Sequence, residues 1–379
     1  MIESRPVRTI ESFFKIFAIF FVLYLFLISI GMIGASFKGL GKDFAQTLIQ
    51  SAAGPFLGLF IGIVVTSLIQ SSSTTTSLIV GMVAAGSFGS DPKMAIAAAI
   101  PYIMGANIGT SVTNTLVSLG HIVQKAEFKR AFSASIVHDF FNVFAVILLF
   151  PLQYYFNIIG KSAFILAEFF IGSGTLAFKS PVKMITKPGV NFIKSILKSQ
   201  DFINYNWLLL ILALILLFLS LRFLTKLIRS LVMAKLEAFF DTHIFKTWFR
   251  GMVFGVFITI LVQSSSITTS LVIPLAGAGI LTLQQIFPYT LGANIGTTIT
   301  ALLASLVSGT LAPLAVAFSH LIFNVLGIAL IYPIPATRNI PIRLSIWFSK
   351  LALKNRLIPI VYIVAVFFMI PLSLIFFMR

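Results

Sequence analysis

GLFIGIVVTSLIQSSSTTTS, residues 58–77, and GMVFGVFITILVQSSSITTS, residues 251–270, are two versions of one stretch. They lie in the apolar runs 54–88 and 251–281, and in each run a cluster of Gln, Ser and Thr interrupts the centre. Each remaining half is too short to span a bilayer comfortably. We therefore predict that each run forms a helical hairpin that enters the membrane and turns back.

The duplication continues beyond these hairpins. PYIMGANIGTSVT, from Pro101, matches PYTLGANIGTTIT, from Pro288, and a later helix repeats a His followed four residues on by Asn, at His138 and His320. Duplicated halves are typical of membrane transporters, because two related units can rock about a shared central site. The expected fold is an all-α polytopic membrane protein with two inverted repeats, each with a re-entrant helical hairpin and a broken transmembrane helix.

The composition independently indicates a membrane protein. Of the 379 residues, 58% are hydrophobic and only 10% are charged, and the mean hydropathy is +1.05. Soluble domains carry about 25% charged residues, so this chain cannot solvate the surface of a soluble protein of its size. Apolar runs of spanning length are expected to cross the membrane near residues 15–36, 94–119, 131–151, 206–224, 285–308, 311–333 and 357–377.

The net charge of +17 suggests a partner of opposite charge. Because the basic residues lie in short loops between apolar runs, we expect positive-inside loops in contact with membrane lipids, and no nucleic acid. Loops 121–130, 225–250 and 336–356 would lie inside, which requires inverted halves and requires that 162–178 does not cross. The basic segment 179–198 argues against this orientation.

The residue content of the chain excludes several kinds of site. The chain contains no cysteine, which excludes disulfides, thiolate metal sites and cysteine nucleophiles. The first apolar run lacks a clear cleavage site, so we expect a retained helix.

The chain divides at changes in composition. The expected parts are an N-terminal helix and loop (1–50), repeat 1 (51–160), an interfacial segment and linker (161–205), repeat 2 with its leading helix (206–335), and a basic loop with a C-terminal helix (336–379).

The polar clusters inside the hairpins carry the chemistry. Ser and Thr in membrane helices can bond back to a carbonyl one turn earlier, but this explains scattered hydroxyls better than two matching polar runs. Backbone that leaves a helix at membrane depth is tolerated only when it is buried or lines a wet cavity. A new helix begins near Ser73 and near Ser266, and helix N-termini attract anions. We predict that the two tips together bind one tetrahedral oxyanion, with oxygens left for a cation.

The segments GANIGT, at 105–110 and at 292–297, are predicted to interrupt the helices that follow the hairpins. The alternative is close helix packing through the GxxxG spacing, and both can hold at once. The alternative does not require the central Asn107 and Asn294. An Asn between two glycines suits a helix break whose carbonyls and amide oxygen bind sodium.

Ionisable residues within an apolar helix indicate function. His138 and Asp139 are such a pair, and Asp139 has no counterpart in the second half, where Leu321 stands. A carboxylate there could neutralise an added cation. The alternative is an interfacial Asp139 paired with Arg130 or Lys129. The two histidines, His138 and His320, fit neutral packing or hydrogen bonding.

An enzyme and a channel are the rival classes. An intramembrane serine hydrolase needs a base beside its serine, but no G-x-S-x-G elbow and no H-E-x-x-H motif is present, so we expect no enzyme. Broken helices also line pores, so the residues alone do not distinguish a transporter from an anion channel.

These motifs together resemble the type II sodium–phosphate cotransporter family. The doubled QSSS, the segments GANIGTSVTNT from Gly105 and GANIGTT from Gly292, and EFKRAFSASIVHDFFN from Glu127 are similar to that family's signatures over most of the chain. The resemblance implies electrogenic symport of inorganic phosphate with sodium as coupling ion, without a cofactor. A transporter of another oxyanion, such as arsenate or sulfate, remains the alternative. The short cysteine-free linker suggests the plasma (inner) membrane of a prokaryote.

The resemblance also implies site residues. Phosphate would be bound by Gln70, Ser71, Ser72, Ser73, Gln263, Ser264, Ser265 and Ser266. Sodium would be bound by Gln70, Thr75, Asn107, Thr110, Asp139, Gln263, Ser266, Thr269, Asn294 and Thr297.

Overall fold

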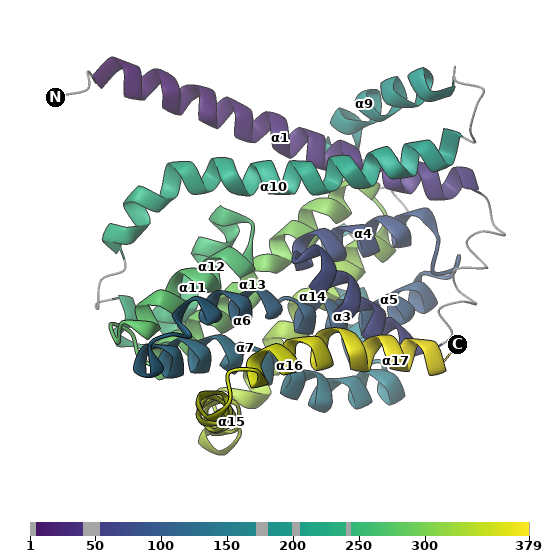
Figure 1. Cartoon of the computed structure of the whole chain (residues 1–379). Helices are drawn as coiled ribbons and strands as arrows, with labels where there is room; N and C mark the ends of the chain where they lie inside the picture. Colours follow the sequence, from purple (N-terminus) through teal and green to yellow (C-terminus); the bar gives the residue numbers. More distant parts are fainter. Residues whose placement is uncertain (1–4, 41–53, 172–180, 199–204, 240–243, 379) are drawn as a thin grey trace.

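The computed structural model describes residues 5–40, 54–171, 181–198, 205–239 and 244–378, and all regular elements in these ranges are helices (Figure 1). The long and hairpin helices are α1 (Arg5–Leu40), α3 (Pro55–Ile69), α4 (Ser72–Ala85), α5 (Pro92–Gly109), α7 (Lys125–Phe156), α10 (Tyr205–Phe239), α11 (Trp248–Val262), α12 (Ser265–Gly277), α13 (Leu283–Ser308) and α14 (Leu311–Ile331). The others are α6 (Val112–Ser118), α8 (Ile158–Ile171), α9 (Pro181–Lys198), α15 (Pro335–Lys354), α16 (Ile358–Val364) and α17 (Ile370–Phe377), with 3-10 turns Leu119–His121 and Ile244–Lys246 and a π-helical turn Ala365–Met369.

The predicted membrane-spanning segments are confirmed as helices of suitable length. Within the described residues, seven helical segments are long and apolar enough to cross a membrane. They are Phe14–Ser36, Pro92–His121, Lys125–Phe156, Tyr205–Leu224, Leu283–Ser308, Leu311–Ile331 and Ile358–Phe377. Large apolar side chains on their outer surfaces, such as Phe17 on α1 and Phe376 on α17, are exposed. An exterior of exposed apolar side chains is suited to contact with the hydrocarbon core of a bilayer.

The first predicted hairpin consists of α3 and α4. Helix α3 ends because Gln70 adopts the left-handed conformation, with φ 55°, which a non-glycine residue rarely adopts. Ser71 then takes an extended conformation, and its hydroxyl accepts a hydrogen bond from the Thr74 backbone N–H at 3.2 Å. The serine therefore acts as the N-cap from which α4 starts.

The second hairpin, α11 and α12, repeats this geometry. Gln263 is again left-handed, with φ 55°, and the Ser264 hydroxyl accepts from the Ile267 N–H at 3.3 Å. In Figure 1, α11 and α12 lie toward the left end of the bundle, with α15, whereas α3 and α4 lie toward the right end, where the C-terminus is.

The GANIGT segments pack closely on the hairpins. Gly105 of α5 lies against the Leu59 carbonyl of α3, and Gly292 of α13 lies against the Met252 carbonyl of α11, so neither position has room for a side chain. The small-residue packing that we kept as an alternative is therefore present in both halves.

In the first half the interruption lies at the end of the GANIGT segment, not within it, and in the second half no interruption is present. Helix α5 ends at Gly109, and α6 begins at Val112, so the first helix is broken after its GANIGT segment. Helix α13 is continuous through residues 292–297, so the prediction of a break there is wrong. The two sequences diverge just beyond this point, because Asn114 in α6 stands where α13 has Ala301.

The remaining helices surround this duplicated centre. Helices α1 and α10 pack against each other along one side of the bundle, and α9 lies near the start of α10 (Figure 1). Helix α8, with 14 residues, is shorter than a membrane span and packs against α14 and α5. The loop before α3 and the parts of the linker at 172–180 and 199–204 lie outside the described residues.

Candidate functional site

The two hairpin tips line one cavity. Its volume is about 400 Å³, and side chains from both halves contribute to its wall. Five of the eight predicted phosphate-binding residues line it, namely Gln70, Ser71, Gln263, Ser264 and Ser266. The other three, Ser72, Ser73 and Ser265, are buried directly beside them in the first turns of α4 and α12. The structure therefore brings the two distant QSSS sequences together.

Backbone geometry makes these tips suitable for an anion. The first N–H groups of a helix have no partner within the helix. In α4 the Ser71 hydroxyl satisfies Thr74, which leaves the N–H groups of Ser72 and Ser73 without an intrahelical acceptor. The same holds for Ser265 and Ser266 in α12. Two helix N-termini, each with free donors and a positive dipole end, therefore meet at one cavity.

The cavity wall also carries positive charge. Arg222 and Lys226 of α10 line it together with Phe218 and Leu221, and its described lining contains no carboxylate. Both basic residues follow the apolar run of α10, so in sequence they are indistinguishable from ordinary basic residues at a membrane boundary. Neither residue was predicted to belong to the site.

A network of buried amides and histidines joins the two halves beside the cavity. Asn107 donates to Asn324 at 3.0 Å and to Asn142 at 3.2 Å, and Asn294 donates to Asn142 at 2.8 Å. All four side chains are buried. Asn107 and Asn294 were predicted to bind sodium, which stays a prediction, and the amide of each makes a contact that crosses between the repeats.

The two repeated histidines belong to the same network. His138 Nε2 lies 2.7 Å from the side-chain oxygen of Asn294, and His320 Nε2 lies 3.3 Å from that of Asn107. Both rings are fully buried. The histidines therefore orient the amides, as the hydrogen-bonding interpretation predicted, and each contact again joins one half to the other.

Asn114 links the second hairpin to this network. Its side-chain oxygen accepts from Thr269 Oγ1 at 2.8 Å and from Ser270 Oγ at 3.2 Å, and its amide nitrogen lies 3.3 Å from His138 Nδ1. The break between α5 and α6 precedes Asn114 directly. Because Asn114 has no match in the second half, the repeat gave no signal for it.

Asp139 is fully buried in α7. One of its oxygens accepts from Thr115 Oγ1 at 3.3 Å, and the hydroxyl groups of Ser111 and Tyr362 also interact with this carboxyl group. Arg130 instead donates to the carbonyl of Gly277, at the end of α12. The predicted alternative, an interfacial Asp139 paired with Arg130, is therefore wrong. Asp139 contacts Thr115 of α6, whereas Arg130 contacts the end of α12.

All four predicted sodium-binding threonines donate to a carbonyl one turn earlier in their own helix. Thr75, Thr110 and Thr297 bond back to the helix carbonyls of Ser71, Ala106 and Ala293. Thr269 also bonds back, to Ser265 at 2.7 Å, besides its contact with Asn114.

Two further threonines, which were not predicted to belong to the site, lie in the last turn of the helices that lead to the tips. Thr66 and Thr259 each accept the backbone N–H of the left-handed glutamine at 2.7 Å through their carbonyls. Their hydroxyls are buried without a hydrogen-bond partner among the described residues. The duplicated stretch matches these two positions, so the signal was present in the repeat.

Known proteins share this sequence pattern. The model of the Na+/Pi-cotransporter family matches residues 25–177 and 216–333. The chain is 32% identical to sodium-dependent phosphate transport protein 2B of Homo sapiens, over 93% of this chain and 63% of that protein. It is 33% identical to sodium-dependent phosphate transport protein 2A of Rattus norvegicus, over 93% of this chain and 66% of that protein.

The chain spans roughly 63 to 66% of the length of these two relatives. They are mammalian, so they give no support to the expected prokaryotic origin. No solved structure matches the chain. The family model covers both repeats and both QSSS tips, and the chain therefore belongs to the Na+/Pi-cotransporter family.

Proposed function

We propose that this chain is a secondary active transporter that imports inorganic phosphate by sodium symport across the plasma membrane. The observation that carries the proposal is the single cavity between the two hairpin tips, which both halves line. The names of the relatives, sodium-dependent phosphate transport proteins, support the same substrate and coupling ion.

Phosphate binding would rest on the serine-rich tips. The backbone N–H groups and the hydroxyls of Ser72, Ser73, Ser265 and Ser266 can donate to a tetrahedral oxyanion, while Arg222 attracts it. Sodium would use neutral oxygens near the tips, among them the unpartnered hydroxyls of Thr66 and Thr259 that are already buried there.

Inverted repeats supply the expected conformational change. The hairpins lie toward opposite ends of the bundle in Figure 1, which supports an inverted relation between the halves. Rocking one half against the other about the shared cavity would open it to alternate sides of the membrane. The buried carboxyl group of Asp139, with the Thr115 hydroxyl beside it, supports an additional sodium and hence electrogenic transport.

The test is phosphate uptake by purified protein in liposomes, with sodium or potassium outside. A symporter accumulates phosphate only with sodium outside, and Ser265→Ala reduces this accumulation. Uptake that does not depend on sodium would contradict symport, and uptake that never exceeds equilibrium would indicate a channel. Competition by arsenate and sulfate identifies the preferred oxyanion.

A further inference from the structure

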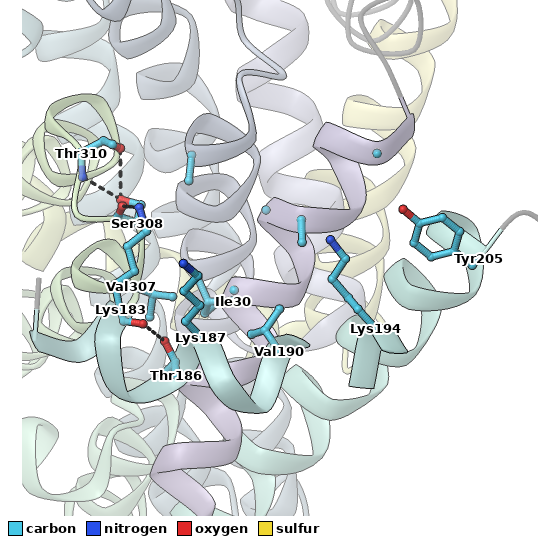
Figure 2. A pocket seen from close by; sticks show the side chains of 15 residues that line it. Ile30, Lys183, Thr186, Lys187, Val190, Lys194, Tyr205, Val307, Ser308 and Thr310 are labelled. Atoms are coloured by element: carbon cyan, nitrogen blue, oxygen red, sulfur yellow. Dashed lines mark hydrogen bonds between the residues drawn. The ribbon is translucent and has the colours of Figure 1, made fainter. Parts of the chain in front are cut away.

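A second cavity lies away from the hairpin tips, between α9, α1 and the turn from α13 to α14 (Figure 2). Its volume is about 480 Å³. Ligand pockets commonly measure about 300–1,000 Å³, so a small ligand or a lipid headgroup fits. In Figure 1, α9 lies at the end of the bundle opposite α15. The transport mechanism proposed above does not use this cavity.

One wall of the cavity is basic. Lys183, Lys187 and Lys194 line it, and all three project from the same side of α9 (Figure 2). Their spacing along the helix explains this shared direction, because residues three, four and seven apart lie on one face. Lys183 donates to the Ser308 carbonyl at 3.0 Å and so fixes α9 to the end of α13. Lys187 and Lys194 make no hydrogen bond or ion pair within the described ranges.

The opposite wall is small and apolar. Ile30, Gly31, Gly34 and Ala35 of α1 form it, and a side chain added at Gly34 would point into open space. The cavity therefore combines ammonium groups on one side with room for a hydrocarbon stem on the other.

The position of α9 relative to lipid agrees with this division. Met184, Ile185 and Phe192, on the face of α9 away from the lysines, are between 63 and 67% exposed. A helix with a basic face and an exposed apolar face is typical of the membrane interface. The lysines accordingly lie at headgroup depth, where each basic residue attracts anionic lipid.

We propose that this cavity binds a phosphate group, with Lys187 and Lys194 as its cationic partners and the Ser308–Thr310 turn beside it. Lysine is a common phosphate-binding residue because its ammonium group acts as a point charge. The phosphate group can be that of an anionic phospholipid, whose glycerol and chain would cover Gly34, or free inorganic phosphate.

The test uses the purified full-length protein in neutral detergent. Binding of short-chain phosphatidylglycerol is measured with the wild type, with the pair Lys187→Gln and Lys194→Gln, and with the control pair Lys350→Gln and Lys354→Gln, which removes the same charge from exposed positions on α15. Loss of both cavity lysines is expected to raise the dissociation constant about tenfold or more, and the control pair is expected to leave it unchanged.

A second arm separates the two sources of phosphate. Binding of inorganic phosphate is measured in the Ser265→Ala background, where the hairpin site is weakened, with and without the pair Lys187→Gln and Lys194→Gln, so that the difference between the two reports the second cavity. Gly34→Leu, which fills the apolar wall without changing charge, weakens phosphatidylglycerol binding if a lipid is the ligand. It leaves inorganic phosphate binding intact if free phosphate is the ligand.

The proposal is overturned if the protein without Lys187 and Lys194 binds both probes as tightly as the wild type. The thermal unfolding midpoint without probe identifies variants that are merely misfolded. In that case the single substitutions Lys187→Gln and Lys194→Gln replace the pair. Since uptake by the hairpin site is measured separately, failure here is distinguishable from failure of the proposed transport function.

Discussion

The side-chain amide of Asn294 donates a hydrogen bond of 2.8 Å to the side-chain oxygen of Asn142. In the corresponding pair, the side-chain amide of Asn107 in the first half donates to the side-chain oxygen of Asn324 in the second half at 3.0 Å. Because these positions match between the repeats, each half supplies one donor and one acceptor to the other. The contact beside the hairpin tips is therefore made twice, across the boundary along which the halves would move.

Asn142→Ala is expected to lower the free energy of unfolding by about 1–3 kcal/mol, because it removes the acceptor of the buried Asn294 amide and one of the two acceptors of the Asn107 amide. Thermal denaturation of the purified protein measures this loss. Asn191→Ala, at an exposed position on α9, is the matched control. Equal stability of the two variants would contradict a structural role for the network.

Asp139→Asn is expected to reduce the charge moved with each phosphate while uptake persists. The substitution keeps the size of the side chain but removes the buried carboxylate that would neutralise an additional sodium. Simultaneous recording of current and radiolabelled phosphate uptake gives the ratio. Glu168→Gln removes an exposed carboxylate on α8 and is expected to leave that ratio unchanged. The same ratio in Asp139→Asn and the wild type would exclude Asp139 from sodium coupling.

Arg222→Gln is expected to raise the KM for phosphate about three- to tenfold, with the larger effect at low ionic strength. The reason is the position of Arg222 on the wall of the tip cavity, where its charge attracts the anion. Arg250→Gln, exposed at the start of α11, removes the same charge away from that wall. If both variants shift KM alike, the effect comes from net charge and the local role is wrong.

Gly292→Ala is expected to destabilise the protein by about 1–3 kcal/mol, because even one methyl group meets the Met252 carbonyl on the neighbouring helix. Gly105→Ala, which meets the Leu59 carbonyl, is expected to behave in the same way. Gly120→Ala adds a methyl group in open space and is the control. Denaturation midpoints compare the three, and a tolerated Gly292→Ala would show that α11 and α13 can separate easily.

Much of the fold could be predicted from the sequence because the repeat carries the information twice. The two hairpins and the seven long helices follow from apolar length and from a polar cluster that would be costly in lipid, whereas the left-handed conformation of the two glutamines was not predicted. The continuous α13 could not be predicted from the GANIGT motif. That motif is the same in both halves, and what differs is the following sequence, where Asn114 replaces the small Ala301.

The site was predicted less completely than the fold. Serines in a repeated motif are visible in sequence, but Arg222 and Lys226 resemble any basic residues near a membrane boundary until α10 is placed beside the tips. Asn114 also depends on tertiary structure, because its role comes from contacts with Thr269 and His138 that lie far away in the chain.

The central claim is that the two QSSS tips form one shared phosphate site. Equilibrium binding of radiolabelled phosphate to the purified protein in sodium tests this most directly. All proteins carry Lys187→Gln and Lys194→Gln, so that the second cavity does not bind phosphate. This background is compared with the same protein carrying Ser72→Ala, Ser265→Ala or both. We predict saturation at one phosphate per chain, with binding that depends on sodium and is weakened by either single substitution. Saturation at two, with each single variant losing one site and keeping the other intact, would contradict it.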